Sequence, residues 1–486
     1  PPDPSPLTPD PSPLTPASLC IIARNEEHNL PACLESVAGL FDDIVVLDTG
    51  STDRTKEIAA QLGARVADFP WVDDFAAARN ECLKHARGAW IFWMDADDRL
   101  DAENREKLGV LLGGLKDENV AFVMKCRCLA EADTGSATVV DHVRLFRNHP
   151  DIRWHYRVHE QILPALRRLG TTVRWTDVVI DHVGYVDSEL RGRKRERDLR
   201  LLRLEDAEHP DDPFTLFNLG SIYHEQGQPG QALPFLHRSL ERSQPGDSIV
   251  RKLYALIAQC QRRLGRAGEG LAACQAGRVH YQDDVELLFQ EALARREEGD
   301  PAGAEACLLR LLTTRERDHF ASVDAGLAGH KARHNLAVLY HEQGRTAEAE
   351  AQWRAALAEN EEFTPAWLGL ADLCLAQGRL DEVTRILGRL EKRAPDGPEM
   401  LILWARLHMG RTDFDSAVGL LEEALDANPR QLPFWILLSH ALLQEGKDWP
   451  GAERALQTVL KLDPGNAQAR SNLAVLQRDH GAELSA

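Results

Sequence analysis

The chain has 486 residues, of which 43% are hydrophobic and 27% are charged. This length allows two to four domains of about 100–200 residues each, and the composition is that of a soluble folded protein rather than a disordered, collagen-like or membrane chain. The net charge of −19 opposes nonspecific attraction to nucleic acid or to anionic lipid. We therefore expect no nucleic-acid partner.

The sequence predicts neither disulfides nor a membrane span. Its nine cysteines are odd in number and lack framework spacing, which indicates reduced thiols and a cytoplasmic protein. There is no run of about 18 apolar residues, and the N-terminus lacks the basic and apolar regions of a signal peptide. Residues 1–17, in which PDPSPLT occurs at 2–8 and again at 9–15, are predicted to be a disordered proline-rich leader.

Residues 18–200 alternate between strand and helix patterns. Short apolar runs bounded by Asp, Gly or Asn predict buried strands, and they occur at 19–22, 44–47, 91–94, 121–124 and 178–180. Helical spacing occurs over 30–40, 55–62 and 75–86. This alternation predicts an α/β domain with a Rossmann-like, mainly parallel sheet.

Beyond residue 200 the strand signals end and a helical repeat begins. Six glycines stand between pairs of helical stretches, most of them about 34 residues apart: Gly227, Gly265, Gly299, Gly344, Gly378 and Gly446. This period resembles the tetratricopeptide (TPR) repeat, in which small residues let the two helices of a hairpin approach closely. We predict an all-α solenoid of about seven units and a truncated one over 201–486. Extra residues at 313–330 interrupt the spacing, so a bend or a loop is expected there.

The pair Asp95 and Asp97 follows the predicted strand 91–94 directly. Carboxylates at the end of a parallel strand lie at the crevice where open α/β sheets bind ligands, and such a pair can hold one hard cation together with a nucleotide. Asp-rich turns are also common in proteins without any ligand. The pair therefore gains its weight from the motifs around it.

Four segments in order carry a resemblance to a known family. They are CIIARNEEHNL at 20–30, IVVLDTGSTDRT at 44–55, DFAAARN at 74–80 and WIFWMDAD at 90–97. Together they closely resemble the family 2 glycosyltransferases of the GT-A fold. The resemblance implies a GT-A domain over 18–200 that uses a nucleotide-sugar donor, and the repeats at 201–486 lie outside it.

The resemblance also implies a nucleotide pocket. Asp48 would hydrogen-bond the nucleobase, and Arg79 and Asn80 would face the nucleotide or the donor sugar. The rest of the base and ribose pocket would be formed by Ala23, Arg24, Asn25 and Glu26. A second interpretation of Asp48 stays open, in which it stabilises a turn or a helix start together with Ser51 and Asp53.

A metal site is implied in the same way. Asp97 would bind Mn²⁺ or Mg²⁺ directly, since oxygen ligands suit these cations, and Asp95 would contact the ribose or the water shell of the metal. His182 follows the predicted strand 178–180, and its position resembles that of the late histidine which completes the metal shell in several GT-A enzymes; a structural histidine is the alternative. Lys194 and Arg197 resemble residues that neutralise the diphosphate, although a solvated helix face would show the same pattern.

The candidate general base lies in the segment 154–162. Its His159-Glu160 pair does not belong to a zinc peptidase, because that motif needs a second histidine at the position of Leu163. In an inverting glycosyltransferase a carboxylate deprotonates the acceptor, and Glu160 is the candidate for this role, with Asp141 as its rival.

These observations predict a metal-dependent, inverting glycosyltransferase that uses a nucleoside-diphosphate sugar, with a UDP-sugar as the expected donor. The repeat array is expected to bind a protein or peptide, either as the acceptor or as a partner. The alternative is a TPR scaffold that carries an inactive glycosyltransferase-like domain.

Overall fold

The structure is a computed structural model that describes residues 16–128, 137–184, 188–314, 319–320, 322–391 and 397–484. The chain divides into two compact units, residues 1–332 and 333–486. Most of the predicted leader, residues 1–15, lies outside the described residues, and the first strand begins at Ala17. No helix in the described part of the chain has both the length and the apolar character needed to cross a bilayer.

A nine-stranded sheet with the order β3-β2-β1-β4-β7-β6-β8-β5 forms the centre of the first unit, and β9 pairs with β7. The predicted parallel arrangement holds for β3-β2-β1-β4, whereas β7 is antiparallel to both β4 and β6, so the whole sheet is mixed. The strands are β1 (Ala17–Ala23), β2 (Asp43–Asp48), β3 (Arg65–Asp68), β4 (Trp90–Asp95), β5 (Asp98–Arg99), β6 (Val120–Cys128), β7 (Thr138–Arg147), β8 (Thr172–His182) and β9 (Ser322–Asp324).

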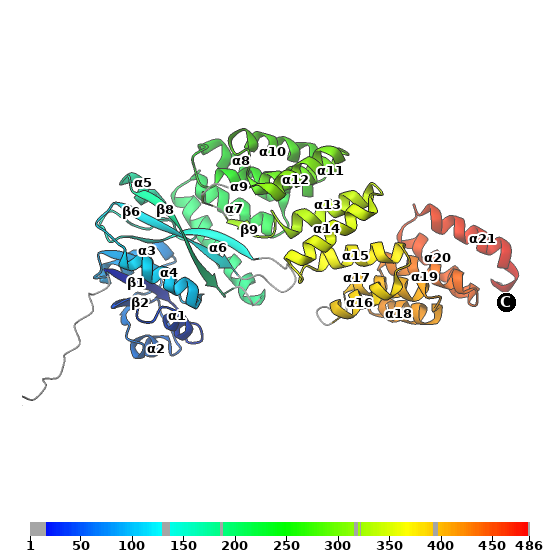
Figure 1. Ribbon diagram of the computed structural model, residues 1–486, viewed down its shortest axis with the longest axis horizontal. Coiled ribbons are helices and arrows are strands. Elements are labelled where there is room, and N and C mark those ends of the chain that lie inside the picture. Colours follow the sequence, from blue (N-terminus) through cyan, green and yellow to red (C-terminus); the bar gives the residue numbers. More distant parts are fainter. Residues whose placement is uncertain are drawn as a thin grey trace, which may run out of the picture. The chain divides into compact units, whose positions relative to one another are not determined.

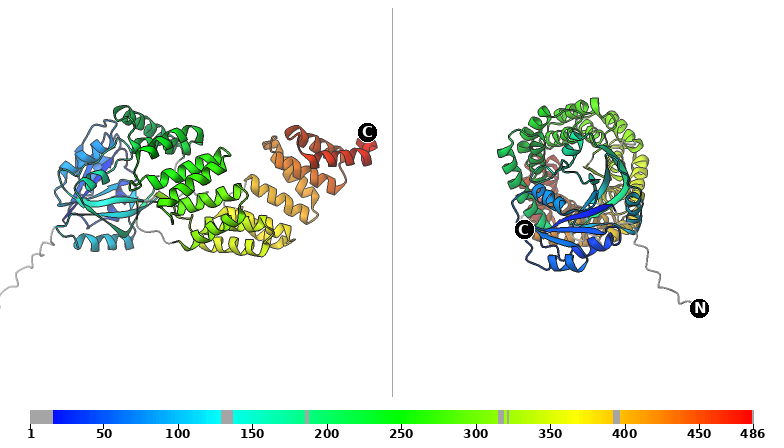
Figure 2. Two further views of the ribbon diagram at one scale, coloured as in Figure 1. Left: turned by 90° about the horizontal axis from the view of Figure 1, so that it is seen from above. Right: turned by 90° about the vertical axis from the view of Figure 1, so that its left-hand side faces the viewer.

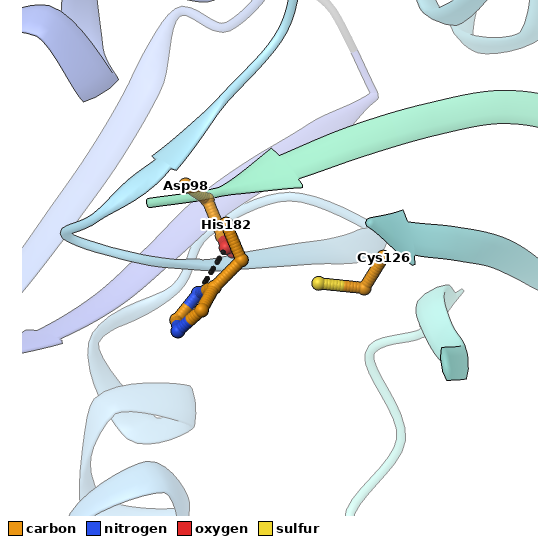
Figure 3. A group of neighbouring side chains, drawn as sticks. All are labelled: Asp98, Cys126 and His182. Atoms are coloured by element: carbon orange, nitrogen blue, oxygen red, sulfur yellow. Dashed lines mark hydrogen bonds and ion pairs between the residues drawn. The ribbon is translucent and has the colours of Figure 1, made fainter. Parts of the chain in front are cut away.

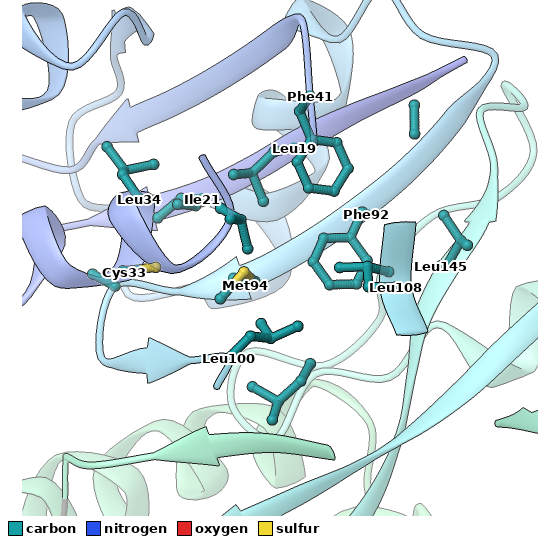
Figure 4. Close-up of a cluster of buried hydrophobic side chains, with 14 of the residues drawn as sticks. Leu19, Ile21, Cys33, Leu34, Phe41, Phe92, Met94, Leu100, Leu108 and Leu145 are labelled. Carbon is teal, nitrogen blue, oxygen red and sulfur yellow. The ribbon is translucent and has the colours of Figure 1, made fainter. Parts of the chain in front are cut away.

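Helices cover both faces of this sheet (Figure 1). They are α1 (Leu30–Ser36), α2 (Thr55–Gln61), α3 (Phe75–His85), α4 (Ala102–Gly113) and α5 (Leu163–Arg168). Helix α6 (Ser188–Glu208) follows β8. Alternate residues of the central strands point to opposite faces: Leu19 and Ile21 pack with Phe92 and Leu108 in one core (Figure 4), and Cys20 packs in the other. Burial on both faces explains why these strands are continuous apolar runs in the sequence.

Helical hairpins follow, as the glycine spacing predicts (Figure 2). The first unit contains α7 (Pro213–Glu225), α8 (Pro229–Arg242), α9 (Val250–Arg263), α10 (Ala267–His280), α11 (Val285–Glu297) and α12 (Pro301–Thr313). Helix α13 (His330–Glu342) crosses the division, and the second unit continues with α14 (Thr346–Glu359), α15 (Thr364–Ala376), α16 (Leu380–Leu390), α17 (Pro398–Gly410), α18 (Phe414–Ala427), α19 (Leu432–Glu445), α20 (Trp449–Leu462) and α21 (Ala467–Leu484).

The six glycines identified in the sequence all stand at hairpin turns. Each has a left-handed backbone with φ between 71° and 76°, a conformation that glycine adopts without steric cost. The turn between α17 and α18 lacks such a glycine, and there Thr412 takes the left-handed conformation at φ 59°. Because a threonine occupies the turn position that glycine takes in the other hairpins, the glycine spacing did not indicate this hairpin.

The interruption at 313–330 contains a strand instead of a simple loop. Its described residues Ser322–Asp324 form β9, which runs antiparallel to Thr138–Val140 of β7. Helices α6 and α7 also pack against the domain, since Leu201, Leu202 and Leu219 share a buried cluster with Val158. The first repeats are therefore built onto the sheet of the α/β domain.

Candidate active site

Strand register brings the predicted motifs to one edge of the sheet. Ala23, the last residue of β1, lies opposite Asp48 at the end of β2, and Ile22 lies opposite Asp95 at the end of β4. Because these strands are parallel, their carboxyl ends open on the crevice where such sheets bind ligands.

Two loops join at the end of this crevice beside β1 and β2. Asn25, which has a left-handed backbone, donates its N–H to Ser51 Oγ (2.9 Å), and its side-chain oxygen accepts the N–H of Thr52 (2.8 Å). Glu26 donates its N–H to Thr55 Oγ1 (2.8 Å), and burial raises the pKa of its carboxyl. The Arg24 side chain is exposed beside them. The loop that follows β1 is thus held in place by the loop that follows β2.

Asp48 stabilises the turn that follows β2, as its second interpretation proposed. Only one of its two carboxylate oxygens is used in this turn. Its Oδ1 accepts the N–H groups of Gly50 and Ser51, both at 2.9 Å. Its Oδ2 is buried and has no hydrogen-bond partner among the described residues. Buried carboxylate oxygens are normally satisfied, so this oxygen marks a place where a ligand donor is favoured.

A buried arginine connects the aspartate pair to the candidate base. Arg79 on α3 donates from Nη2 to Asp95 Oδ1 (2.8 Å) and from Nε to Glu160 Oε1 (2.5 Å). Its guanidinium carbon lies 4.1 Å from the ring centre of Trp93 and 5.2 Å from that of Trp154. Burial alone would raise the pKa of Asp95, but the charges of Arg79 and its neighbours outweigh burial and hold that pKa well below its usual range.

Asp97 and His182 meet because β5 pairs with the end of β8. This pairing places His182 Nδ1 3.5 Å from Asp97 Oδ1, and Val183 donates its N–H to the Asp97 carbonyl (3.1 Å). Burial, followed by the repulsion of Asp95 and Asp98, raises the pKa of Asp97. Burial would lower the pKa of His182, yet its hydrogen bond to Asp98 and the nearby carboxylates raise that pKa to about 9. Both shifts favour the protonated forms of Asp97 and His182. A bound cation would displace these protons.

A third aspartate, Asp98, holds His182 in place (Figure 3). Asp98 is fully buried, its Oδ1 lies 2.9 Å from His182 Nδ1, and its Oδ2 accepts from both Arg144 (2.8 Å) and the Asp95 N–H (2.8 Å). Cys126 lies close enough for these three side chains to be a candidate metal cluster. Because both oxygens of Asp98 are already hydrogen-bonded and buried, we interpret Asp98 as a support for His182 instead of a ligand.

The other predicted residues lie around this centre. Asn80 uses both ends of its amide on the backbone of Trp154, at 3.0 and 2.8 Å, and so fixes the segment that leads to Glu160. Lys194 reaches the carbonyl of Gly184 (3.4 Å). Arg197 pairs with Asp198 (2.7 Å) and lies over the ring of Phe75.

Glu160 and Asp141 lie on different elements but share a cavity of about 150 Å³. Glu160 lies in a tight turn that is closed by the bridge between His155 and Gln161, and His159 in this turn has a left-handed backbone. Asp141 is on β7, opposite Lys125 of β6. The structure therefore keeps both candidates for the general base near one another.

Sequence reasoning missed three contributors to this site. Asp98 directly follows the aspartate pair and was not singled out, and Arg144 lies in a strand that was not predicted. Gly184 has no side chain to attract notice, but a Cβ added to it would lie 1.8 Å from Asp97 Oδ2. A glycine two residues after the histidine was the only available signal for this close approach.

Comparison with known proteins relates the two parts of the chain to two kinds of family. The family described as Glycosyl transferase family 2 matches residues 18–182, and Tetratricopeptide repeat families match 215–247, 340–407, 402–448 and 436–486. A TPR repeat-containing protein of Synechococcus elongatus is 35% identical over 278 residues, which cover 56% of this chain and 68% of that protein.

The SPbeta prophage-derived glycosyltransferase SunS of Bacillus subtilis is 30% identical over 259 residues, 51% of this chain and 58% of SunS, so the chain spans less than two thirds of that relative. Among solved structures, a tetratricopeptide repeat protein from Parabacteroides merdae is similar at 18% identity and a TM-score of 0.43, over 55% of this chain and 98% of that one. The chain therefore carries a family 2 glycosyltransferase domain over residues 18–182, which is joined to tetratricopeptide repeats.

Proposed function

We propose that this protein transfers a sugar from a nucleoside-diphosphate sugar, with a UDP-sugar as donor, to an acceptor with inversion at the sugar carbon. The observation that carries the proposal is the buried Arg79, which contacts Asp95 on the donor side and Glu160 on the acceptor side. We place the catalytic domain at 18–200 and the solenoid at 201–486.

The donor set fits a divalent cation. Asp97 and His182, with Asp95 nearby, supply oxygen and nitrogen atoms, and Gly184 leaves room beside the Asp97 carboxylate that a side chain would fill. Such donors suit Mn²⁺ or Mg²⁺. When bound, the cation neutralises the charge of the diphosphate. Asp98 keeps the histidine ring in one orientation.

The nucleotide is assigned to the crevice beside β1 and β2. The unsatisfied Oδ2 of Asp48 favours an N–H donor of the nucleobase, and the fixed loop from Ala23 to Glu26 forms the wall beside it. The positive charge of Lys194, which acts on Asp97, lowers the electrostatic cost of binding phosphate there. Arg79 orients Asp95, and Asn80 acts through Trp154.

Glu160 is assigned as the general base. One of its oxygens is fixed by Arg79, and its other oxygen, Oε2, has no hydrogen bond among the described residues. In the reaction, the acceptor oxygen or sulfur forms a bond to the sugar carbon, the bond from that carbon to the phosphate oxygen breaks, and Glu160 takes the acceptor proton. Asp141 on the same cavity is the competing assignment.

We assign the repeats to binding a protein or peptide partner. The nine cysteines are all free of disulfides, which supports a reducing, cytoplasmic location. A scaffold with an inactive domain would have no reason to bind UDP in a metal-dependent way. Isothermal titration of UDP with and without Mn²⁺ tests the proposal. The wild type should bind UDP only with Mn²⁺ and hydrolyse a UDP-sugar slowly, and Asp97→Ala or a chelator should abolish both. Equal UDP binding with and without Mn²⁺ in the wild type would remove the metal assignment.

A further inference from the structure

The cavity that contains Glu160 lies between the catalytic sheet and the first repeats, within the first unit. Trp93, Asp141, Trp154 and Glu160 line it from the catalytic domain, and Phe214 and Phe217 line it from α7. Its volume of about 150 Å³ is comparable to a cavity that holds one benzene-sized group. The reacting carboxylate therefore faces a space that the catalytic domain does not form alone.

The far wall of this cavity is held by contacts between the repeats and β9. Lys252 on α9 donates to the carbonyl oxygen of Ser322 (2.9 Å) and to Glu286 of α11 (2.5 Å). Ser322 and Val323 belong to β9, which is paired with β7 next to Asp141. Repeats, inserted strand and catalytic sheet thus meet around one cavity.

The chemistry of the walls selects the kind of group that fits. About half of the lining residues are aromatic or aliphatic, and several of the polar ones are already used: Lys252 as above, Arg251 on Asp284 (3.5 Å), and Trp93 Nε1 on the carbonyl of Val143 (2.7 Å). A saccharide has a hydroxyl on nearly every carbon, and a space that holds one benzene-sized group leaves no room to pair all of them. A single amino-acid side chain has a hydrocarbon stem and one nucleophile, which Oε2 of Glu160 can meet.

We propose that this cavity is the acceptor site and that it receives one hydroxyl- or thiol-bearing side chain of a peptide segment. This inference rests on the proposed function. The side-chain O–H or S–H gives its proton to Glu160, its oxygen or sulfur bonds to the sugar carbon, and the nucleoside diphosphate leaves with the electron pair of the broken bond. The peptide backbone stays outside, against the first repeats.

The test uses the full chain, the UDP-sugar that it hydrolyses, and blocked pentapeptides acetyl-Gly-Gly-X-Gly-Gly-amide with X as Ser, Thr, Cys, Tyr or Ala. Mass spectrometry measures sugar addition to each peptide. Ser248→Trp places an indole in the cavity from the loop before α9, and Val323→Trp does so from β9. Each should reduce peptide labelling by about 100-fold, because the reacting atom is displaced. Their affinity for UDP with Mn²⁺ should equal that of the wild type.

The matched control is His237→Trp, which adds the same indole to an exposed position of α8 that does not line the cavity, and it should label peptides normally. Labelling that persists in both cavity variants would overturn the location. Labelling of maltotriose or chitotriose instead of any peptide would overturn the peptide assignment, and so would hydrolysis without any peptide product. Absence of both UDP binding and hydrolysis in the wild type would instead defeat the proposed function itself.

Discussion

Replacing Gly184 with alanine should weaken cation binding by about 100-fold without unfolding the protein. The added methyl group would lie 1.8 Å from Asp97 Oδ2 and 3.3 Å from His182 Nε2. Since side-chain carbons do not approach other atoms closer than about 3.0 Å, the carboxylate must move by about 1.2 Å. Gly184 is not in the left-handed region, so the backbone itself tolerates alanine. The perturbation therefore acts on the two proposed metal ligands alone.

The expected loss follows from this displacement. Disturbing the partners of metal ligands costs about 10–100-fold in affinity, and a displaced ligand belongs at the upper end of that range, about 100-fold or about 2.7 kcal/mol. Electron paramagnetic resonance of free Mn²⁺ during a titration with UDP present measures this affinity. Gly192→Ala is the matched control, because no atom lies within 4 Å of the Cβ it adds in α6. The control should keep Mn²⁺ affinity and gain up to about 1 kcal/mol of stability from helix propensity.

Wild-type Mn²⁺ affinity in Gly184→Ala would refute the reasoning, because a cation held by Asp97 cannot be indifferent to a carboxylate that has moved. An equal loss in Gly192→Ala would place the effect in helix α6 instead. Circular dichroism on both variants separates either result from unfolding.

Three further outcomes are expected. Glu160→Gln should lower kcat by about 10²–10⁴-fold with UDP affinity unchanged, and Asp141→Asn should not; the reverse pattern in steady-state kinetics would exchange their roles. Asp98→Asn should weaken Mn²⁺ binding about 10–100-fold and lower the free energy of unfolding by about 3–5 kcal/mol in urea denaturation, since it leaves the buried Arg144 without its charge partner; a change in neither would show that the pair is idle. Arg79→Lys should lower kcat while UDP binding persists, because a lysine cannot hold both carboxylates in the geometry of a guanidinium; wild-type kcat would contradict the bridging role.

The fold could be predicted from sequence where burial is simple. Strands β1, β2 and β4 are apolar along most of their length because helices cover both of their faces. Strand β7 escaped prediction because Asp141, His142 and Arg144 interrupt its apolar pattern. The pattern does not reveal that Arg144 is buried against Asp98 and the ring of Trp93, since that pairing joins distant segments.

The candidate site could likewise be predicted from the sequence only in part. Asp95 and Asp97 could be located from the strand that precedes them, and their neighbours from motif resemblance. The contact of Arg79 with both Asp95 and Glu160 depends on how the segment 154–161 folds back over α3, and no local spacing encodes it. Asn80 was expected to face the nucleotide, whereas its amide is spent on the Trp154 backbone.

Strand β9 makes the order of synthesis matter for this protein. The edge of β7 at Thr138–Val140 leaves the ribosome long before Ser322–Asp324 can pair with it. The backbone N–H and C=O groups of this edge therefore stay unpaired in the nascent domain while the three intervening helical hairpins are synthesised. A fragment that stops at the end of the α/β domain would keep that edge exposed and prone to pair with other chains. Any chimera in which the repeats of this protein are exchanged must therefore retain the β9 segment together with the α/β domain.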